Sequence, residues 1–146
     1  MKVKSFLGAV EHERVVQAIR DAEARSAGEI RVHVTAQTVD DAQAAAAAQF
    51  EALGMTKTAE RNGILIYIAP QSQKFAIIGD IGVHTKCGTD FWHSVAKVMG
   101  DDFRGGRFTD GIVKGVMQAG DLLARNFPCA PGRADVNELP DTVSED

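Results

Sequence analysis

The chain has 146 residues, of which 45% are hydrophobic and 25% are charged, the proportions of an ordinary globular protein. No apolar run approaches the roughly 20 residues that a membrane-spanning helix needs, and MKVKSFLGAVEHERV meets acidic residues too soon for a signal-peptide core. Cys87 and Cys129 lie far apart, and we expect two unpaired thiols. We therefore expect a cytoplasmic protein that does not insert into a membrane.

The net charge of −4 lies entirely in the last residues of the chain. Residues 128–146 carry five acids and one base, whereas residues 1–127 carry 15 charges of each sign. A neutral body is not the surface of a nucleic-acid binder, because neutralising phosphates requires an excess of lysine and arginine. The tail has few large apolar residues and contains Pro131 and Pro140. We predict one domain over residues 1–127 and an acidic, disordered tail over residues 128–146.

The first half of the chain alternates between helical and extended patterns. Apolar residues at helical spacing predict a helix over about residues 10–26, with Gly28 placed to end it. The strict alternation of EIRVHVTA, residues 29–36, predicts a strand that places His33 on its wetter face, as a surface or stem-packed residue. Acids at the start and a glycine at the end predict a second helix over residues 40–54.

The second half begins with a hairpin and ends in helices. GILIYIA, residues 63–69, is a continuous apolar run typical of a central strand, and the turn PQSQ joins it to KFAIIG, residues 74–79. Residues 89–103 predict a third helix. After the break RGGRF, Thr109 is placed to cap a last helix that ends near residue 127. Glycines weaken an isolated helix, so those in the last helix predict close packing: Gly111, Gly115 and Gly120.

This order of elements predicts an α/β fold. The strand, helix and strand over residues 29–69 form a right-handed crossover between two parallel strands, and the PQSQ turn adds an antiparallel strand. A small mixed sheet of this kind buries its apolar residues by packing helices on both faces. We therefore expect a three-layer α/β/α sandwich.

The expected topology brings polar residues to one edge of the sheet. Asp80 at the end of the third strand would lie near Glu29, which opens the first strand. It would also lie near Arg61 and Asn62, which precede the second strand, and His84 would reach the same edge from a loop. Two carboxylates and an amide oxygen suit Ca²⁺ or Mg²⁺, so Glu29, Asn62 and Asp80 form a candidate metal site. The alternative is structural, with Glu29 and Arg61 as an exposed ion pair and Asp80 capping a glycine turn.

Catalysis at the same edge is a second hypothesis. A metal and Arg61 would balance the charge of a phosphate, and His84 or a carboxylate, Asp80 or Glu29, would act as general acid. The sequence carries no seryl, cysteinyl or aspartyl phosphatase signature. It also lacks the glycine-rich loops of nucleotide sites, so we expect no nucleotide cofactor.

Two further patterns are less specific. His84 and Cys87, with His93 further along, have a zinc-like spacing but lack a convincing fourth ligand. Arg104 and Arg107 flank two glycines, where they could bind an anion at the start of the last helix or form an exposed connection.

The motifs, taken in order, resemble the TPM domain family, named after thylakoid-lumen and photosystem II repair proteins and a receptor modulator. The matching stretches are AEARSAGEIRVHV, FEALGMTKTAERNGILIYIAP, KFAIIGDIGVH, GTDFW and FRGGRFTDGIVKGV, which together cover roughly residues 10–128. The resemblance implies an α/β/α sandwich related to Rossmann-type folds. The chain looks like the short soluble branch of the bacterial members.

The resemblance also carries functional expectations. Some members of the family are described as acid phosphatases, some bind calcium at one sheet edge, and others act in repair or assembly without established catalysis. The positions that match the family's polar edge are Glu29, Asn62 and Asp80. We expect a non-catalytic binding or assembly module with a Ca²⁺ or Mg²⁺ site at that edge. The alternative is a metal-assisted acid phosphatase at the same edge, and the implied partner is a LemA-type membrane protein.

Overall fold

A computed structural model describes residues 2–58, 60–88, 90–128 and 143–145. Its helices are α1 (Val3–Gly8), α2 (His12–Ala24), α3 (Ala42–Ala52), α4 (Ile81–Cys87), α5 (Asp90–Arg104) and α6 (Phe108–Asn126). Its strands are β1 (Glu29–Val34), β2 (Gly63–Ala69), β3 (Lys74–Gly79) and β4 (Ser144–Glu145), and two 3₁₀ turns are η1 (Met55–Lys57) and η2 (Pro70–Ser72). Within these residues, no helix is long and apolar enough to cross a membrane.

The strands form one mixed sheet in the order β3-β2-β1-β4. β1 and β2 run parallel from the pair Glu29 and Gly63, and β3 returns antiparallel to β2, with Gly79 opposite Ile64. The predicted crossover and hairpin are therefore confirmed. The register places the beginnings of β1 and β2 and the end of β3 at one edge of the sheet, as the topology required.

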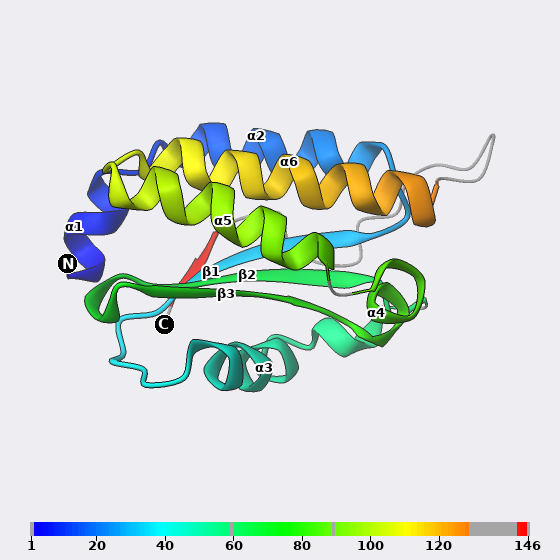
Figure 1. The fold of residues 1–146 in the computed structure, drawn as a ribbon, viewed down its shortest axis with the longest axis horizontal. Helices are drawn as coiled ribbons and strands as arrows, with labels where there is room; N and C mark the ends of the chain where they lie inside the picture. The colour runs from blue at the N-terminus through cyan, green and yellow to red at the C-terminus, as the bar shows by residue number, and fades with distance from the viewer. Residues whose placement is uncertain (1, 59, 89, 129–142, 146) are drawn as a thin grey trace.

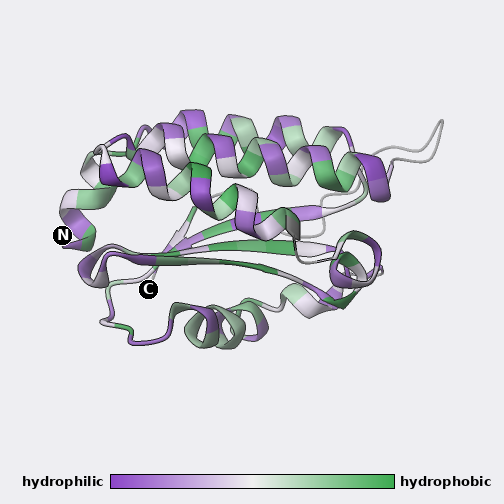
Figure 2. Cartoon of the chain, in the orientation of Figure 1, coloured by the Kyte–Doolittle hydropathy of each residue, from purple (hydrophilic) through white to green (hydrophobic). Residues whose placement is uncertain are grey.

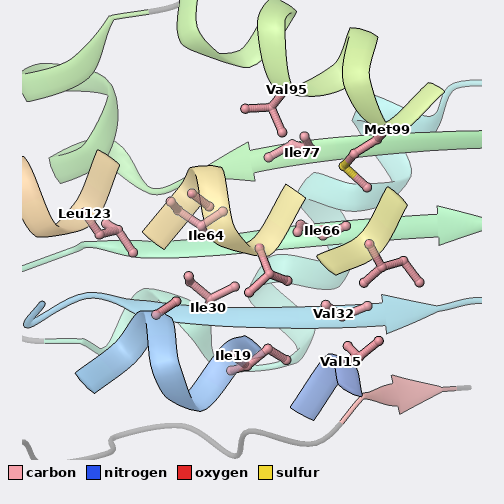
Figure 3. Close-up of a cluster of buried hydrophobic side chains, with 14 of the residues drawn as sticks. Val15, Ile19, Ile30, Val32, Ile64, Ile66, Ile77, Val95, Met99 and Leu123 are labelled. Atoms are coloured by element: carbon pink, nitrogen blue, oxygen red, sulfur yellow. The ribbon is translucent and has the colours of Figure 1, made fainter. Parts of the chain in front are cut away.

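The sheet lies between two layers of helices, so the predicted three-layer sandwich is confirmed. Figure 1 shows α2, α5 and α6 on one side of the strands and α3 on the other. The larger core lies between the sheet and the α2, α5 and α6 layer, and Figure 3 shows its side chains meeting from all of these elements. Val15 and Ile19 of α2 and Met99 of α5 have almost no exposed surface there.

The smaller core lies under α3. Ala46 and Phe50 of this helix pack with Leu65 and Tyr67 of β2, and Met55 of η1 completes the cluster. Ala42 and Ala45 of α3 are partly buried against the same cluster. Both faces of β2 are covered, which explains its continuous apolar sequence. Figure 2 shows β2 and β3 hydrophobic along most of their length, whereas α2 and α6 carry both hydrophilic and hydrophobic residues.

Capping residues set the limits of the helices, and two of the predicted capping residues have other roles. Asp41 caps α3 by accepting hydrogen bonds from the amides of Gln43 and Ala44. Gly28 does not end α2, which stops at Ala24. A Cβ on Gly28 would lie 2.7 Å from Leu123, so the glycine is needed for close packing against α6. Thr109 lies inside the first turn of α6, where its Oγ1 accepts a hydrogen bond from the amide of Glu11 at 3.0 Å.

Two short helices and one short strand were not predicted. α1 and α4 have six and seven residues, too few for a helical period to be read from the sequence. The tail forms strand β4, which pairs parallel to β1 with Ser144 opposite His33. Residues 129–142 and 146 of the tail, with the thiol predicted at Cys129, lie outside the described residues. Cys87 is a free thiol in α4, as predicted.

Candidate functional site

The candidate edge is built around the carboxylate of Asp80, which is only 5% exposed. Arg61 donates to both of its oxygens, with Nε 2.7 Å from Oδ2 and Nη2 2.8 Å from Oδ1. The amide of Ile81 also donates to Oδ1, at 2.7 Å, so Asp80 is the N-cap of α4. Asp80 therefore accepts three hydrogen bonds, two of them in the strong bidentate arrangement of a guanidinium with a carboxylate.

The backbone around Asp80 is equally constrained. The amide of Asp80 donates to the Gly63 carbonyl at 2.9 Å, and the amide of Gly82 donates to the Arg61 carbonyl at 2.9 Å. A Cβ on Gly82 would lie 2.4 Å from the carbonyl oxygen of Glu60, which no real side chain tolerates. Arg61 has φ +52°, in the left-handed region that non-glycine residues seldom adopt. The second glycine of the GDIG sequence is thus explained by the close approach of α4 to the loop before β2.

Asn62 links the start of β2 to the segment before β1. Its side chain is buried, its Nδ2 donates to the Ala27 carbonyl at 3.0 Å, and its amide donates to Thr58 Oγ1 at 3.2 Å. Its Oδ1 is buried without a hydrogen-bond partner. Buried oxygens of this kind are unusual and call for a specific explanation, such as a water or an ion. Asn62 Oδ1 is therefore an atom of this edge that is suited to accept a ligand.

Glu29 is buried on the same edge, two strands away from Asp80. With strands about 4.8 Å apart, the two Cα atoms are separated by about 10 Å. The space above the intervening Gly63 is filled, because a Cβ there would contact Met55 and Phe50 at 3.4–3.5 Å. The alternative expectation of an exposed pair between Glu29 and Arg61 is wrong, since Glu29 is buried and Arg61 pairs with Asp80.

His84 lies on α4 rather than in a loop, and its exposed ring sits edge-on to Trp92 with centroids 6.2 Å apart. Its amide donates to the carbonyl of Asp80, so the side chain is placed one turn beyond the capping residue. Cys87 lies in the same helix, and burial raises the pKa of its thiol. In the described part of the chain, no three or more His, Cys, Asp or Glu side chains are grouped to hold a metal ion.

Two polar clusters outside this edge were missed by the sequence analysis. His33 is buried rather than exposed, with its Nδ1 2.7 Å from Ser144 Oγ and its ring stacked on Tyr67. Asp102 is a buried carboxylate held by Arg107 and Lys114, both at 3.0 Å. Strand alternation groups His33 with Glu29 and Thr35, but all three are buried, so this face is not the wetter one. The contact of His33 with β4 and the Asp102 cluster depend on tertiary packing.

Asp102 also fixes the role of Arg107. The carboxylate accepts from Arg107 Nε, and the carbonyl of Asp102 accepts from the amide of the same residue at 2.8 Å. Hydrogen bonds from Lys114 and Arg107 hold the pKa of Asp102 below its ordinary value. Arg107 is therefore committed to the corner between α5 and α6, which leaves Arg104 as the more accessible cation of the RGGR sequence.

These features define a small α/β sandwich with a polar edge where a hairpin strand ends beside two parallel strands. The family model of the TPM domain matches residues 2–122. The chain belongs to the TPM domain family, and the resemblance inferred from its sequence is confirmed. No curated protein matches the chain significantly.

Two solved structures are similar to this fold. The NMR structure of BA42 protein from the psychrophilic bacterium Bizionia argentinensis is 38% identical, with a TM-score of 0.85 over 93% of this chain and 92% of that one. The solution structure of the N-terminal domain of a protein from P. gingivalis is 18% identical, with a TM-score of 0.57 over 76% of this chain and 72% of that one. The second likeness is one of fold alone.

Proposed function

We propose that the chain is a non-catalytic binding or assembly module of the TPM type. The observation that supports this proposal is the state of Asp80, the central acid of the candidate edge. Both of its oxygens accept hydrogen bonds from Arg61, and one also caps α4. A carboxylate engaged in this way has little free capacity to act as a base or nucleophile, because three of its roughly four lone-pair sites are occupied.

A phosphatase assay tests this proposal. The purified protein is incubated with p-nitrophenyl phosphate from acidic to mildly basic pH, with and without millimolar calcium or magnesium. We expect no release of p-nitrophenol above the buffer blank. Turnover that disappears in folded Asp80→Asn and Glu29→Gln variants would overturn the proposal, whereas turnover unchanged by both substitutions identifies a contaminant.

A divalent cation at the Glu29, Asn62 and Asp80 edge is a separate proposal. The unpartnered Asn62 Oδ1 supports it, and so do the hard oxygen ligands gathered on the same edge. The bidentate contact of Arg61 opposes it, because a guanidinium occupies the Asp80 oxygens that a cation would need. Calcium would therefore bind Asp80 only if the Arg61 side chain turned outward.

Calcium titration followed by NMR tests whether the cation binds at this edge in spite of the Arg61 contact. If the cation binds, the amides of Gly28, Asn62 and Gly79 shift, and the Arg61→Gln variant binds calcium more tightly than the unmodified chain. Arg14→Gln is the matched control, since Arg14 also pairs with carboxylates but lies on α2. An absence of shifts at millimolar calcium in both proteins would contradict the cation proposal.

The alternative function is a metal-assisted phosphomonoesterase at the same edge. The observation that favours it is the Arg61 side chain, which is 46% exposed and pairs with Asp80, the residue that lies one helical turn before the exposed His84. Arg61 would hold a phosphate, and His84 would protonate the leaving group. The p-nitrophenyl phosphate assay distinguishes this alternative, with His84→Gln expected to lose activity at low pH. A LemA-type partner and a cytoplasmic location remain predictions from the sequence.

A further inference from the structure

Strand β4 joins the sheet through a much shorter ladder than the other strands. It pairs with β1 through two residues, Ser144 opposite His33 and Glu145 opposite Val34, whereas β2 pairs with β1 through six. Figure 1 shows this short red strand beside β1, on the side of the sheet away from β3. The residue before it, Val143, is only partly buried at the margin of the larger core.

The neighbouring strand β1 is buried in the way that a central strand is. Ile30, Val32 and Val34 are at most 1% exposed on one face, and Glu29 and His33 are at most 2% exposed on the other. The edge of such a strand presents a row of amide and carbonyl groups, which pair with an extended chain laid against them. The backbone groups that β4 satisfies on β1 are therefore groups that another extended segment can satisfy.

The side chains around β4 show which residues the β1 edge selects. Val143 packs against the larger core, and the alternation of an extended chain turns Ser144 to the opposite face. There Ser144 Oγ lies 2.7 Å from His33 Nδ1 and 3.4 Å from the carbonyl oxygen of Val32. The His33 ring is buried and stacked on Tyr67, with centroids 5.8 Å apart, so its orientation is fixed by the smaller core. The edge thus holds an apolar residue followed by a hydroxyl.

Strand β4 can leave the sheet without dismantling the other strands. The ladders that join β1 to β2 and β2 to β3 do not involve it. Ser144 is half-buried, and Glu145 is exposed and forms no ion pair with the described residues. Elements with few buried contacts open locally at a lower free energy than the core does. We therefore expect β4 to detach while the rest of the domain stays folded.

We propose that the β1 edge binds an extended peptide of a partner protein, and that β4 occupies this site as an internal ligand which the partner displaces. The peptide runs parallel to β1, with an aliphatic residue in place of Val143 and a serine or threonine opposite His33. This inference rests on the proposed binding function and names the kind of partner. The site lies where β1 ends, opposite the Asp80 edge, so peptide binding can fail without any change in the phosphatase assay.

A peptide titration followed by NMR tests the proposal. The ligand is the peptide LPDTVSED, residues 139–146, and the protein carries Ser144→Pro, which removes the hydroxyl and one amide from β4. We expect saturable shifts of the His33 and Val34 amides. Wild type should bind the peptide several-fold more weakly, because its own β4 competes from within the same chain. Ser144→Thr, the matched control, keeps the hydroxyl and should behave as wild type does.

Two results of this titration would overturn the proposal. One is the absence of binding to folded Ser144→Pro. The other is a Ser144→Pro variant that does not fold, since β4 would then be an integral part of the domain. A wild-type dimer that is absent in Ser144→Pro, without peptide binding, would assign the edge to β4 of a second copy and would also overturn it.

Changes in the peptide test what the edge recognises. Alanine in place of the peptide's serine removes the hydroxyl that contacts His33 Nδ1, and binding should weaken roughly tenfold. Proline at that position should abolish binding, because it cannot donate to the ladder. Glutamine in place of the next glutamate is the matched control and should bind equally, since Glu145 is exposed. Equal binding of the alanine and serine peptides would contradict selection by His33.

Hydrogen exchange in wild type tests the detachment of β4 without a substitution. The amides of Ser144 and Glu145 should exchange through an opening of lower free energy than the one that exposes the amides of β2. If both groups exchanged only through global unfolding, β4 would not leave the folded domain, and the proposal would be contradicted.

Discussion

At the scale of single residues, Asp80 is a carboxylate whose hydrogen-bonding capacity is largely taken up by contacts within the fold. Its side chain pairs with Arg61 and caps α4, while its amide donates to Gly63 across the sheet edge. These contacts join the loop before β2, the end of β3 and the start of α4. The aspartate that ends the apolar run AIIGD thus caps a helix, whereas the structural alternative inferred from the sequence had it capping a glycine turn.

The first prediction concerns the cap. Asp80→Ala removes the oxygen that accepts from the Ile81 amide and leaves Arg61 without its carboxylate. Loss of an N-cap costs about 0.5–2 kcal/mol, and we expect a fall of about 2 kcal/mol in the free energy of unfolding, measured by urea denaturation. Asp121→Ala is the matched control, because this half-exposed acid pairs with Arg25 on the helix surface. Exposed pairs are worth about 0–1 kcal/mol, so an equal loss in the control would contradict the special role of Asp80.

The second prediction concerns Gly82. Its added Cβ in Gly82→Ala would meet the backbone oxygens of Glu60 and Arg61 at 2.4 and 2.6 Å, and backbone atoms cannot turn aside. Overpacking costs about 1–3 kcal/mol, and we expect a loss of about 3 kcal/mol by urea denaturation. Gly8→Ala is the control, because a Cβ on Gly8 meets nothing within 4 Å. If Gly82→Ala were as stable as wild type, α4 would be able to move away from the loop before β2.

At the scale of elements, the long helix α6 is fitted to its neighbours by its glycines. A Cβ would lie 2.7 Å from Phe103 at Gly111, 2.5 Å from Met99 Sδ at Gly115, and 2.5 Å from the Ala22 Cβ at Gly120. The first two neighbours belong to α5 and the third to α2. The predicted close packing of this helix is therefore confirmed, with a different neighbour for each glycine.

These neighbours predict unequal effects of substitution. Gly120→Ala gains about 1 kcal/mol of helix propensity but forces α6 away from a rigid alanine at a cost of about 1–3 kcal/mol. We expect a net loss of up to about 2 kcal/mol, seen as a lower Tm. Gly115→Ala should be nearly neutral, because the flexible Met99 side chain can move. A larger loss for Gly115→Ala than for Gly120→Ala would contradict this account of the packing.

The ion pairs of Asp102, at the corner between α5 and α6, predict that the stability of the protein depends on pH. Lys114 and Arg107 lower the pKa of Asp102 in the folded state. A carboxyl with a lowered folded pKa stabilises the protein above its unfolded pKa of about 4, and this stabilisation is lost as the pH falls through the folded value. We expect Asp102→Asn to be less stable at neutral pH, with the difference from wild type narrowing below about pH 4. A difference that stays constant across this range would contradict the ion-pair assignment.

At the scale of the whole molecule, the sequence predicted the layers of helices and strands better than the contacts between individual side chains. The alternation of β1, the apolar run of β2 and the PQSQ turn were sufficient for the mixed sheet, because strand periodicity and turn chemistry are local signals. The same topology correctly brought Glu29, Asn62 and Asp80 to one edge. It could not show that Arg61 pairs with Asp80 rather than Glu29, since partner choice depends on side-chain geometry and on the position of α4.

The two ends of the sheet are built differently. The beginning of β2 is joined to the end of β3 and to α4 by the Arg61 and Asp80 contact, whereas the end of β2 borders a hollow lined by phenylalanines. We infer that Asp80 belongs to the structure of its edge, because Arg61 and the Ile81 amide occupy its oxygens.

A double-mutant cycle between Arg61 and Asp80 tests this claim most directly. The free energy of unfolding is measured for wild type, Arg61→Gln, Asp80→Asn and the double variant. If the two side chains act as one structural unit, the double variant loses less stability than the two single variants lose together. Strictly additive losses would show that the contact contributes nothing to the fold, and Asp80 would then be free for another role.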